Sequence, residues 1–330
     1  MKFEHLQGSI VAMVTPFRQD GGVNFDVLTE LLERQIAAGT DGILTLGTTG
    51  EYSTMSHEED AAVVEHTIRV VDGRVPVIVG SGSNCTATQI EKSILYQNMG
   101  ADALLLIAPY YNKANAEGMY RHFAETADAV HIPCILYNVP SRTGVSFTAE
   151  SYKVLAQNPK INGVKEASGN FSLLAHTRFL CPDDFYIWSG NDDQVVPMMS
   201  LGAKGVISVA SNIIPEVMVK MSHLCLEGQF EDASKLQIAY MDLIDALFCE
   251  AQGRLHARYA ATYDCNSLHY SLMSYIVSVG QQLTTADAGL PIYFPLRPRY
   301  LAAGSYSTPI LSSRGSTSTW CICIPSTHGS

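Results

Sequence analysis

The sequence predicts an α/β protein whose core is a closed (β/α)8 barrel. Eight apolar, strand-like runs lie between residues 9 and 211 of the 330-residue chain, and helical patterns separate them. Strands that alternate with helices indicate parallel βα units, and eight such units fit a barrel, whose usual size is about 250 residues. In order, the runs are 9–17, 41–47, 75–82, 103–111, 132–140, 161–168, 185–190 and 204–211.

The segments between these runs carry helical signals. Residues 24–39 have apolar side chains at a spacing of three to four positions, as on one face of a helix. Residues 56–73 open with Ser56 as an N-cap and Glu59 three positions later, which is a capping box. Further helical patterns cover 117–130 and 191–203.

The alternative fold is an open, doubly wound parallel sheet. That fold usually carries a G-x-G-x-x-G fingerprint directly after its first strand. Here the glycine-rich stretch "GSGSN" at 80–84 follows the third run and lacks the final glycine. The closed barrel is therefore the favoured interpretation.

Composition and charge exclude several classes of function. The formal net charge is −11, and an acidic surface repels nucleic acid and anionic membranes. No run reaches the roughly 18 apolar residues of a membrane-spanning helix, and the N-terminus lacks the pattern of a signal peptide. We therefore expect no nucleic-acid partner and no membrane partner.

The cysteines indicate a reducing compartment. Six of the eight are isolated, and the pair Cys321 and Cys323 has no second pair with which to build a metal site. Cys134 lies in an apolar run, where a free thiol acts as a small hydrophobe. This pattern fits the cytoplasm better than a disulfide framework, and we expect no metal.

Polar side chains gather where the predicted strands end. In a (β/α)8 barrel, the active site lies at the carboxyl ends of the strands. A lysine, an arginine and several hydroxyls meet at this rim without a cluster of histidines or carboxylates, which argues against a metal hydrolase and a two-carboxylate glycosidase. These rim residues are Thr48, Thr49, Tyr110, Tyr111, Tyr137, Arg142 and Lys165.

Lys165 is the most informative of them, because a lysine is rarely buried without a partner. If Lys165 points into the barrel, Glu166 points away from it. A desolvated, unpaired lysine has a lowered pKa and becomes a nucleophile that can form a Schiff base with a carbonyl substrate. Tyr137 ends the adjacent strand and could shuttle the protons of that reaction. Arg142 could bind a substrate carboxylate through two hydrogen bonds.

Each of these residues also has a structural interpretation. A lysine at a strand end is usually solvated, Tyr137 could be a core residue, and Arg142 could form a surface ion pair. The "GTTG" stretch at 47–50 could be a tight turn or could bind the carboxylate of a small keto acid. Their occurrence at one rim of consecutive strands favours the catalytic interpretation.

Four motifs carry a resemblance to a known family. They are "GTTGE" at 47–51, "PYYNK" at 109–113, "YNVPSRTG" at 137–144 and "GVKEASGN" at 163–170. In this order they resemble the 4-hydroxy-tetrahydrodipicolinate synthase (dihydrodipicolinate synthase) family of class I pyruvate-dependent aldolases, from about residue 3 to 250. The resemblance implies a (β/α)8 barrel that condenses pyruvate with L-aspartate 4-semialdehyde, in diaminopimelate and lysine biosynthesis.

The resemblance also implies roles for individual residues. Lys165 would form the Schiff base with pyruvate, so no external cofactor is needed, and Tyr137 would donate and accept protons. Tyr111 would reach the site of a neighbouring subunit, which implies a homo-oligomer, commonly a dimer of dimers. The resemblance further implies that Thr48 forms a proton relay with Tyr111 and Tyr137. Thr49 and the backbone of Ile207 would bind pyruvate. Arg142 would bind the carboxylate of the semialdehyde, and Gly190 would line the pocket.

Related aldolases are the main alternative. N-acetylneuraminate lyases and keto-deoxy sugar-acid aldolases share the lysine and the tyrosine, but Arg142 and Tyr111 favour the synthase. His57, Asn84 and Tyr110 match the family's site for feedback inhibition by lysine. Asp60 and Thr88 depart from that pattern, so we expect no inhibition by lysine.

The C-terminal part of the chain departs from the family pattern. We expect the barrel in residues 1–227 and the start of a helical region in 228–250. Residues 251–330 contain no Lys and no Glu and carry a net charge of +3, against −14 for the first 250 residues. We interpret this segment as a changed reading frame or a fusion, with a divergent C-terminal domain as the alternative. We expect it to pack poorly, in which case the barrel could be catalytically impaired.

Overall fold

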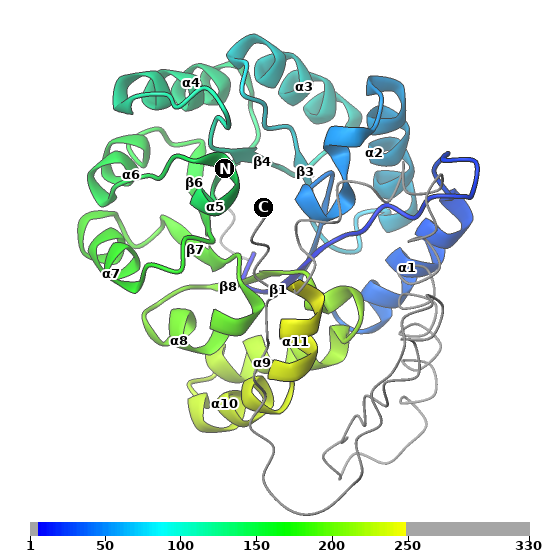
Figure 1. Ribbon diagram of the computed structural model, residues 1–330, viewed down its shortest axis with the longest axis vertical. Helices are drawn as coiled ribbons and strands as arrows, with labels where there is room; N and C mark the ends of the chain where they lie inside the picture. The colour runs from blue at the N-terminus through cyan, green and yellow to red at the C-terminus, as the bar shows by residue number, and fades with distance from the viewer. Residues whose placement is uncertain (1–5, 249–330) are drawn as a thin grey trace, which may run out of the picture. The chain divides into compact units, whose positions relative to one another are not determined.

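The computed structural model describes residues 6–248, so the expectations for the segment 251–330 lie outside the described residues. Within 6–248, eight parallel strands pair in chain order and β1 pairs with β8, which closes the barrel. The predicted (β/α)8 barrel is thus confirmed (Figure 1). The strands are β1 Gly8–Ala12, β2 Gly42–Thr45, β3 Val77–Gly80, β4 Ala103–Ile107, β5 Cys134–Asn138, β6 Ile161–Glu166, β7 Tyr186–Ser189 and β8 Gly205–Ser208.

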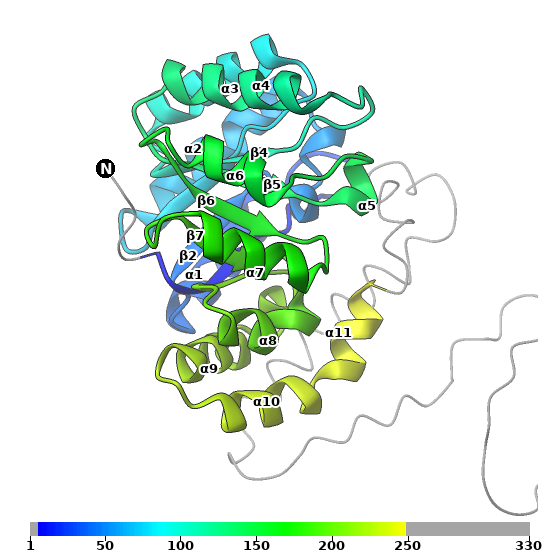
Figure 2. The same ribbon diagram turned by 90° about the vertical axis from the view of Figure 1, so that its left-hand side faces the viewer.

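Helices surround the strands and connect each one to the next (Figures 1 and 2). The predicted capping box is present, since the Ser56 side chain accepts from the backbone of Glu59 and the Glu59 side chain accepts from the backbone of Ser56. The helices are α1 Phe25–Ala37, α2 His57–Val71, α3 Thr86–Met99, α4 Ala116–Ala129, α5 Pro140–Thr143, α6 Ala149–Leu155, α7 Phe171–Leu180, α8 Val195–Ser200, α9 Pro215–Leu226, α10 Phe230–Ala239 and α11 Met241–Phe248. Short 3-10 turns are η1 Thr48–Gly50, η2 Tyr52–Thr54, η3 Asp192–Gln194 and η4 Ala210–Asn212.

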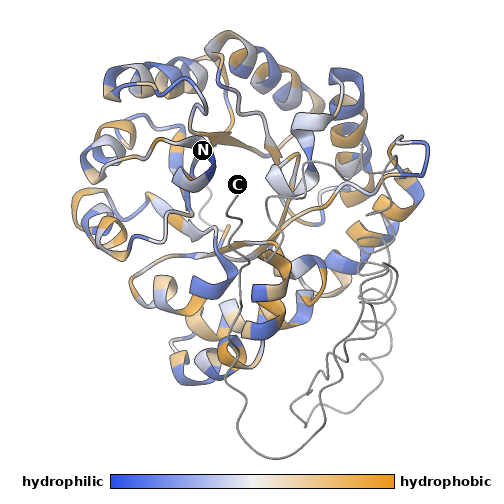
Figure 3. Ribbon diagram, in the orientation of Figure 1, coloured by the Kyte–Doolittle hydropathy of each residue, from blue (hydrophilic) through white to orange (hydrophobic). Residues whose placement is uncertain are grey.

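The strands are apolar on both faces because both faces are buried. One cluster of side chains fills the barrel interior and includes Ile10, Leu105 and Trp188. A second, larger cluster lies between the strands and the helices. Figure 3 shows several of the strands coloured as hydrophobic at the centre of the molecule, with mixed colours on the surrounding helices. This double burial explains why most of the strands read as nearly continuous apolar runs in the sequence.

Two helices follow the barrel in the region where a helical start was expected. Helix α10 packs against α8 and α9, and α11 contacts η3 and α10. The Gln237 amide of α10 accepts the backbone N–H of Val196 at 2.8 Å and donates to the carbonyl of Asp193. The helices after the barrel therefore support the loop that follows β7. No helix within residues 6–248 is long and apolar enough to cross a membrane.

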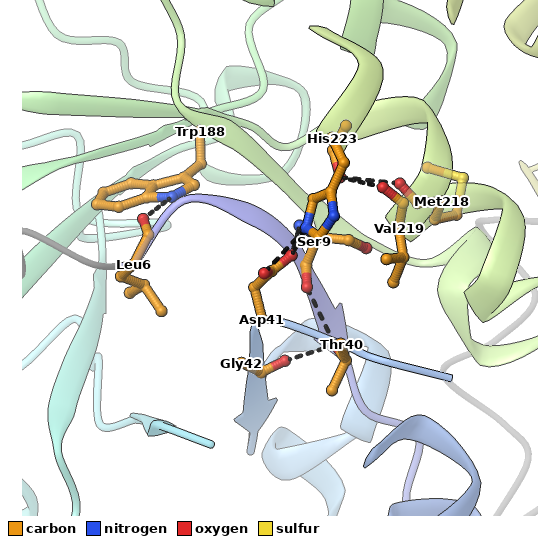
Figure 4. Close-up of polar contacts among 10 residues, drawn as sticks. Leu6, Ser9, Thr40, Asp41, Gly42, Trp188, Met218, Val219 and His223 are labelled. Carbon is orange, nitrogen blue, oxygen red and sulfur yellow. Dashed lines mark hydrogen bonds and ion pairs between the residues drawn. The ribbon is translucent and has the colours of Figure 1, made fainter. Parts of the chain in front are cut away.

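A polar network joins elements at the amino-terminal end of the barrel (Figure 4). The Asp41 carboxylate accepts the backbone N–H of Ser9 in β1 at 2.7 Å and lies 2.9 Å from Nε2 of His223 in α9. Gly8 has a φ of +107°, and a Cβ there would lie 2.1 Å from the Asp41 carboxylate. Asp41 therefore holds the start of β1 against the α1–β2 loop and α9.

Replacing Asp41 with alanine is expected to destabilise the protein by about 2 kcal/mol, the size of a lost hydrogen bond to a charged group. The Ser9 N–H would lose its acceptor. Thermal unfolding should show a melting temperature lower by roughly 4–8 °C, the usual conversion for a domain of this size. Asp41→Asn keeps one acceptor oxygen and should lose clearly less; equal losses in the two variants would contradict this assignment.

Candidate active site

The loops at the carboxyl ends of the strands hold backbone conformations that non-glycine residues rarely adopt. Leu46 and Glu51, which flank the Thr48–Thr49 turn, have φ values of 54° and 56°. Tyr111 and Lys113, after β4, have φ values of 71° and 50°. Left-handed conformations of bulky residues cost energy and concentrate at functional sites. This rim is therefore the part of the barrel to examine for chemistry.

Lys165 lies in β6 with its side chain inside the barrel, and only 5% of the residue is exposed. Tyr137 of β5 and Trp188 of β7 are its register neighbours on the two sides. The Lys165 ammonium nitrogen lies 4.7 Å from the centre of the Tyr137 ring. The lysine and the tyrosine that the sequence placed on adjacent strands thus face each other.

Burial lowers the pKa of Lys165 to about 8. The negative charge of Asp192 raises the pKa of Lys165 and so opposes this shift, whereas the positive charge of Arg142 lowers it further. No ion pair involving Lys165 occurs within the described part of the chain. A lysine in this state has a sizeable fraction of neutral amine near neutral pH, and the neutral amine is the nucleophilic form.

The Tyr137 phenol is also buried, and burial raises its pKa. The charge of Arg142 and hydrogen bonding with the Thr48 hydroxyl lower it. Thr48 and Arg142 themselves are exposed, in η1 and α5 at the mouth of the barrel. Tyr137 is therefore a neutral proton donor between the buried lysine and the polar rim.

Glu166 faces away from the barrel interior and has its own set of donors. The Asn138 amide donates to both of its oxygens at 3.0 Å, and the Tyr152 hydroxyl donates at 2.9 Å. The backbone N–H of Ser168 donates at 2.8 Å. A buried carboxylate is tolerated when it is hydrogen-bonded in this way. Since Asn138 and Glu166 follow Tyr137 and Lys165 directly in their strands, this network fixes β5 to β6 beside the two reactive side chains.

Gly190 lies against the Lys165 side chain. A Cβ on Gly190 would lie 3.2 Å from Cε of Lys165 and 2.7 Å from Cβ of Ala167, so only glycine leaves room for the lysine. Ile207 of β8 is completely buried in the barrel interior. Thr49 is half-buried in η1 beside Thr48.

A small cavity opens beside Tyr137. Its polar side chains are Thr48, Tyr52 and Tyr137, and the rest of its lining is apolar or glycine. Among the residues of 6–248, no group of three or more His, Cys, Asp or Glu side chains could hold a metal ion.

Tyr111 is a candidate site residue that, within a single chain, does not lie beside Thr48 and Tyr137. It is 89% exposed and points outward from the loop after β4. Within residues 6–248, Tyr137 interacts with Thr48, Arg142, Lys165 and Tyr52, and Tyr111 is not among these partners. Within one chain, the relay from Thr48 through Tyr137 to Tyr111 is therefore incomplete.

The structure also brings in residues that the sequence reasoning did not select. Asp192, three residues after the end of β7, is buried and acts electrostatically on Lys165. Tyr52, in η2, lines the cavity and interacts with Tyr110. A signal for Asp192 was available, because a carboxylate that follows a barrel strand lies at the catalytic rim.

Asp60 and Thr88 are the two positions at which the sequence departs from the family's pattern for the site of feedback inhibition by lysine. Asp60 is buried in α2 and forms an ion pair with Lys92 of α3 at 2.8 Å. Lys92 also lies 5.9 Å from the centre of the Tyr52 ring. The carboxylate at position 60 thus already has a lysine partner from its own chain.

A barrel with a buried, low-pKa lysine beside a phenol at its carboxyl-terminal rim is characteristic of lyases of the class I aldolase type. Comparison with known proteins identifies the group. The sequence pattern of the dihydrodipicolinate synthetase family matches residues 5–263, past the change of composition after residue 250. The chain belongs to this family, which confirms the resemblance carried by the four motifs.

Individual relatives agree with this assignment. A 4-hydroxy-tetrahydrodipicolinate synthase of Clostridium novyi (strain NT) is 46% identical over 244 residues, which cover 74% of this chain and 82% of that protein. A crystal structure of a dihydrodipicolinate synthase is 43% identical, with a TM-score of 0.72, over 73% of this chain and 83% of that one. The dihydrodipicolinate synthase of Cyanidioschyzon merolae, solved with lysine bound, is 38% identical with a TM-score of 0.72, over 74% of this chain and 84% of that one.

Proposed function

We propose that this chain condenses pyruvate with L-aspartate 4-semialdehyde to give 4-hydroxy-tetrahydrodipicolinate, a step of diaminopimelate and lysine biosynthesis. The observation that carries the proposal is the buried Lys165 amine facing the Tyr137 ring at 4.7 Å. Family membership supports it over the sugar-acid aldolases and N-acetylneuraminate lyases, because the curated relative named above is a synthase.

The chemistry starts on the nitrogen of Lys165. The neutral amine attacks C2 of pyruvate, and the carbinolamine loses its oxygen as water, which leaves a positively charged imine. Loss of a proton from the methyl carbon gives an enamine, which attacks the aldehyde carbon of the semialdehyde. Attack by the amino group of the bound product on C2 closes the ring and releases Lys165 as the free amine. No external cofactor is needed for these steps.

The residues at the rim have separate tasks in this proposal. Tyr137 donates and accepts the protons of carbinolamine formation and dehydration, and the Thr48 hydroxyl connects it to the rim. Arg142, exposed at the mouth, binds the carboxylate of the semialdehyde. Pyruvate is held by Thr49 and the backbone of Ile207, and Gly190 leaves space for the lysine.

The proposal includes a homo-oligomer, at least a dimer and commonly a dimer of dimers. Tyr111 supports it, because an aromatic residue that is 89% exposed in a strained loop is unusual unless another surface covers it. In a dimer, Tyr111 would complete the relay in the site of the other subunit. Sedimentation of the full chain should give a mass of at least two copies, and a monomer that turns over substrate would contradict this part of the proposal.

Two further parts of the proposal concern the setting and the domains. The four cysteines described in residues 6–248 are unpaired, which supports a reducing, cytoplasmic environment. We assign the catalytic barrel to residues 1–227 and the beginning of a helical region to 228–250. Translation of the other two reading frames of the gene after codon 250 tests whether 251–330 arose by a frameshift.

The test of the activity uses the full chain. Incubation with pyruvate and borohydride should give a reduced adduct on the intact mass, and peptide mapping should place it on Lys165. Pyruvate with aspartate semialdehyde should then turn over, while N-acetylneuraminate and keto-deoxy sugar acids should not. An adduct without turnover of the semialdehyde would favour a related aldolase, and a folded protein without an adduct would contradict the proposal.

A further inference from the structure

Asp192 is a buried carboxylate at the junction of two rim loops. It is the first residue of η3, after β7, and is 1% exposed. Its Oδ2 atom accepts the backbone N–H groups of Val209 at 3.0 Å and Ala210 at 2.9 Å, where the chain leaves β8. Its other oxygen, Oδ1, is buried and accepts no hydrogen bond within the described part of the chain. Asp192 thus ties the β7 loop to the β8 loop and keeps an unused acceptor.

The same carboxylate acts on Lys165. Trp188 of β7 is the register neighbour of Lys165, and Gly190, two residues before Asp192, has no side chain to separate the strand end from the lysine. Asp192 favours the charged form of Lys165, and Lys165 favours the charged form of Asp192. Glu166, the next residue after the lysine, cannot serve in this way because Asn138, Tyr152 and Ser168 occupy its oxygens outside the barrel.

The other groups that face Lys165 do not supply a negative charge. Arg142 is positive and disfavours the ammonium, and the Tyr137 phenol is neutral because burial raises its pKa. Burial raises the pKa of Asp192 above its ordinary value, and the N–H groups of Val209 and Ala210, the Ser208 hydroxyl and Lys165 oppose this shift in part. Two N–H donors on one oxygen are the partners of a carboxylate rather than of a carboxylic acid.

We propose that Asp192 is a positioning residue for the Schiff-base chemistry, whose negative charge stabilises the positive nitrogen of Lys165 before and after it bonds to pyruvate. The inference rests on the proposed function. In that step the neutral amine and the ketone combine with one proton and release one water, so the nitrogen ends with a positive charge. A fixed carboxylate nearby stabilises both the ammonium and the imine that replaces it.

Asp192 could instead serve only to join the two loops, and the Asp192→Asn variant separates these roles. The amide oxygen still accepts from the two backbone N–H groups, while the charge is lost. The readout is the pH dependence of the initial rate of borohydride-trapped pyruvate adduct, followed by intact mass. We expect the midpoint of this profile to fall by roughly one pH unit, about a tenfold change in the proton affinity of Lys165.

The neighbouring Asp193 provides the matched control. It is exposed and does not act on Lys165. Asp193→Asn removes the same charge one position further along and should leave the midpoint of the wild-type profile unchanged. A folded Asp192→Asn protein with the wild-type midpoint, or an equal shift in both variants, would overturn the inference.

Two further outcomes of this experiment also decide whether the inference holds. If Asp192→Asn does not fold, as judged by circular dichroism, Asp192→Ser replaces it, because it also removes the charge and keeps a hydroxyl oxygen as an acceptor. That variant should shift the midpoint in the same direction, and an unchanged midpoint in the folded variant would overturn the inference. Absence of any adduct in the folded wild-type protein would instead overturn the proposed function, and the inference with it.

Discussion

Lys165→Ala is expected to eliminate the pyruvate adduct and to lower kcat/KM by at least about 10³-fold, since removal of a nucleophile costs this much or more. The reason is the lowered pKa of the Lys165 amine. Its pKa of about 8 leaves roughly one tenth of it neutral at pH 7, against far less for an ordinary lysine. In the wild-type protein, trapping should therefore rise about tenfold per pH unit below 8 and level off above it, and intact mass measured across pH follows this directly.

A matched variant shows whether the loss is specific. Lys153 is an exposed lysine on α6, and Lys153→Ala should keep both the adduct and the turnover. Circular dichroism of all three proteins shows whether the fold is retained. An adduct that persists in folded Lys165→Ala would mean that another amine reacts. A trapping rate that continues to rise to pH 10 would mean that burial does not activate Lys165.

The barrel could be predicted from the sequence because strands that are buried on both faces appear as apolar runs. Each of the eight apolar runs overlaps one observed strand, from β1 at Gly8–Ala12, which begins one residue before its run, to β8 at Gly205–Ser208. Helices with a capping side chain were also visible, as at Ser56 before α2. Helix α3 was not among the expected helices, and its N-cap, Cys85, makes no side-chain cap hydrogen bond. A helix held mainly by packing gives a weaker local signal than a capped one.

For the candidate site, the sequence could place residues on the rim but could not give their partners. Strand alternation was enough to separate Lys165 from Glu166, since neighbouring residues face opposite sides. The partners of Glu166 come from β5 and α6, and the contact of Asp192 with the start of η4 joins two loops. Such contacts depend on how the barrel closes and on how loops fold back over it. No local spacing in the sequence encodes them.

Tyr137→Phe is the second variant with a large expected effect, and it acts at a different step from Lys165→Ala. The phenyl ring keeps the volume and the face that lies 4.7 Å from the Lys165 nitrogen, so the interior of the barrel stays filled. The variant loses only the hydroxyl that interacts with Thr48. Loss of a positioned proton donor typically costs 10²–10⁴-fold, so kcat should fall by about that factor while the adduct on Lys165 still forms, more slowly.

Tyr152→Phe is the control, because it removes another fully buried phenolic hydroxyl that points away from the barrel interior. That hydroxyl donates to Glu166 at 2.9 Å, so its loss should cost about 2 kcal/mol of stability and little of kcat. Steady-state kinetics and thermal unfolding should distinguish the two variants. We expect Tyr137→Phe to lower the turnover rate and Tyr152→Phe to lower the stability. If both variants lost turnover equally, the effect would come from disturbed packing around β5 and β6, and Tyr137 would have no special part in proton transfer.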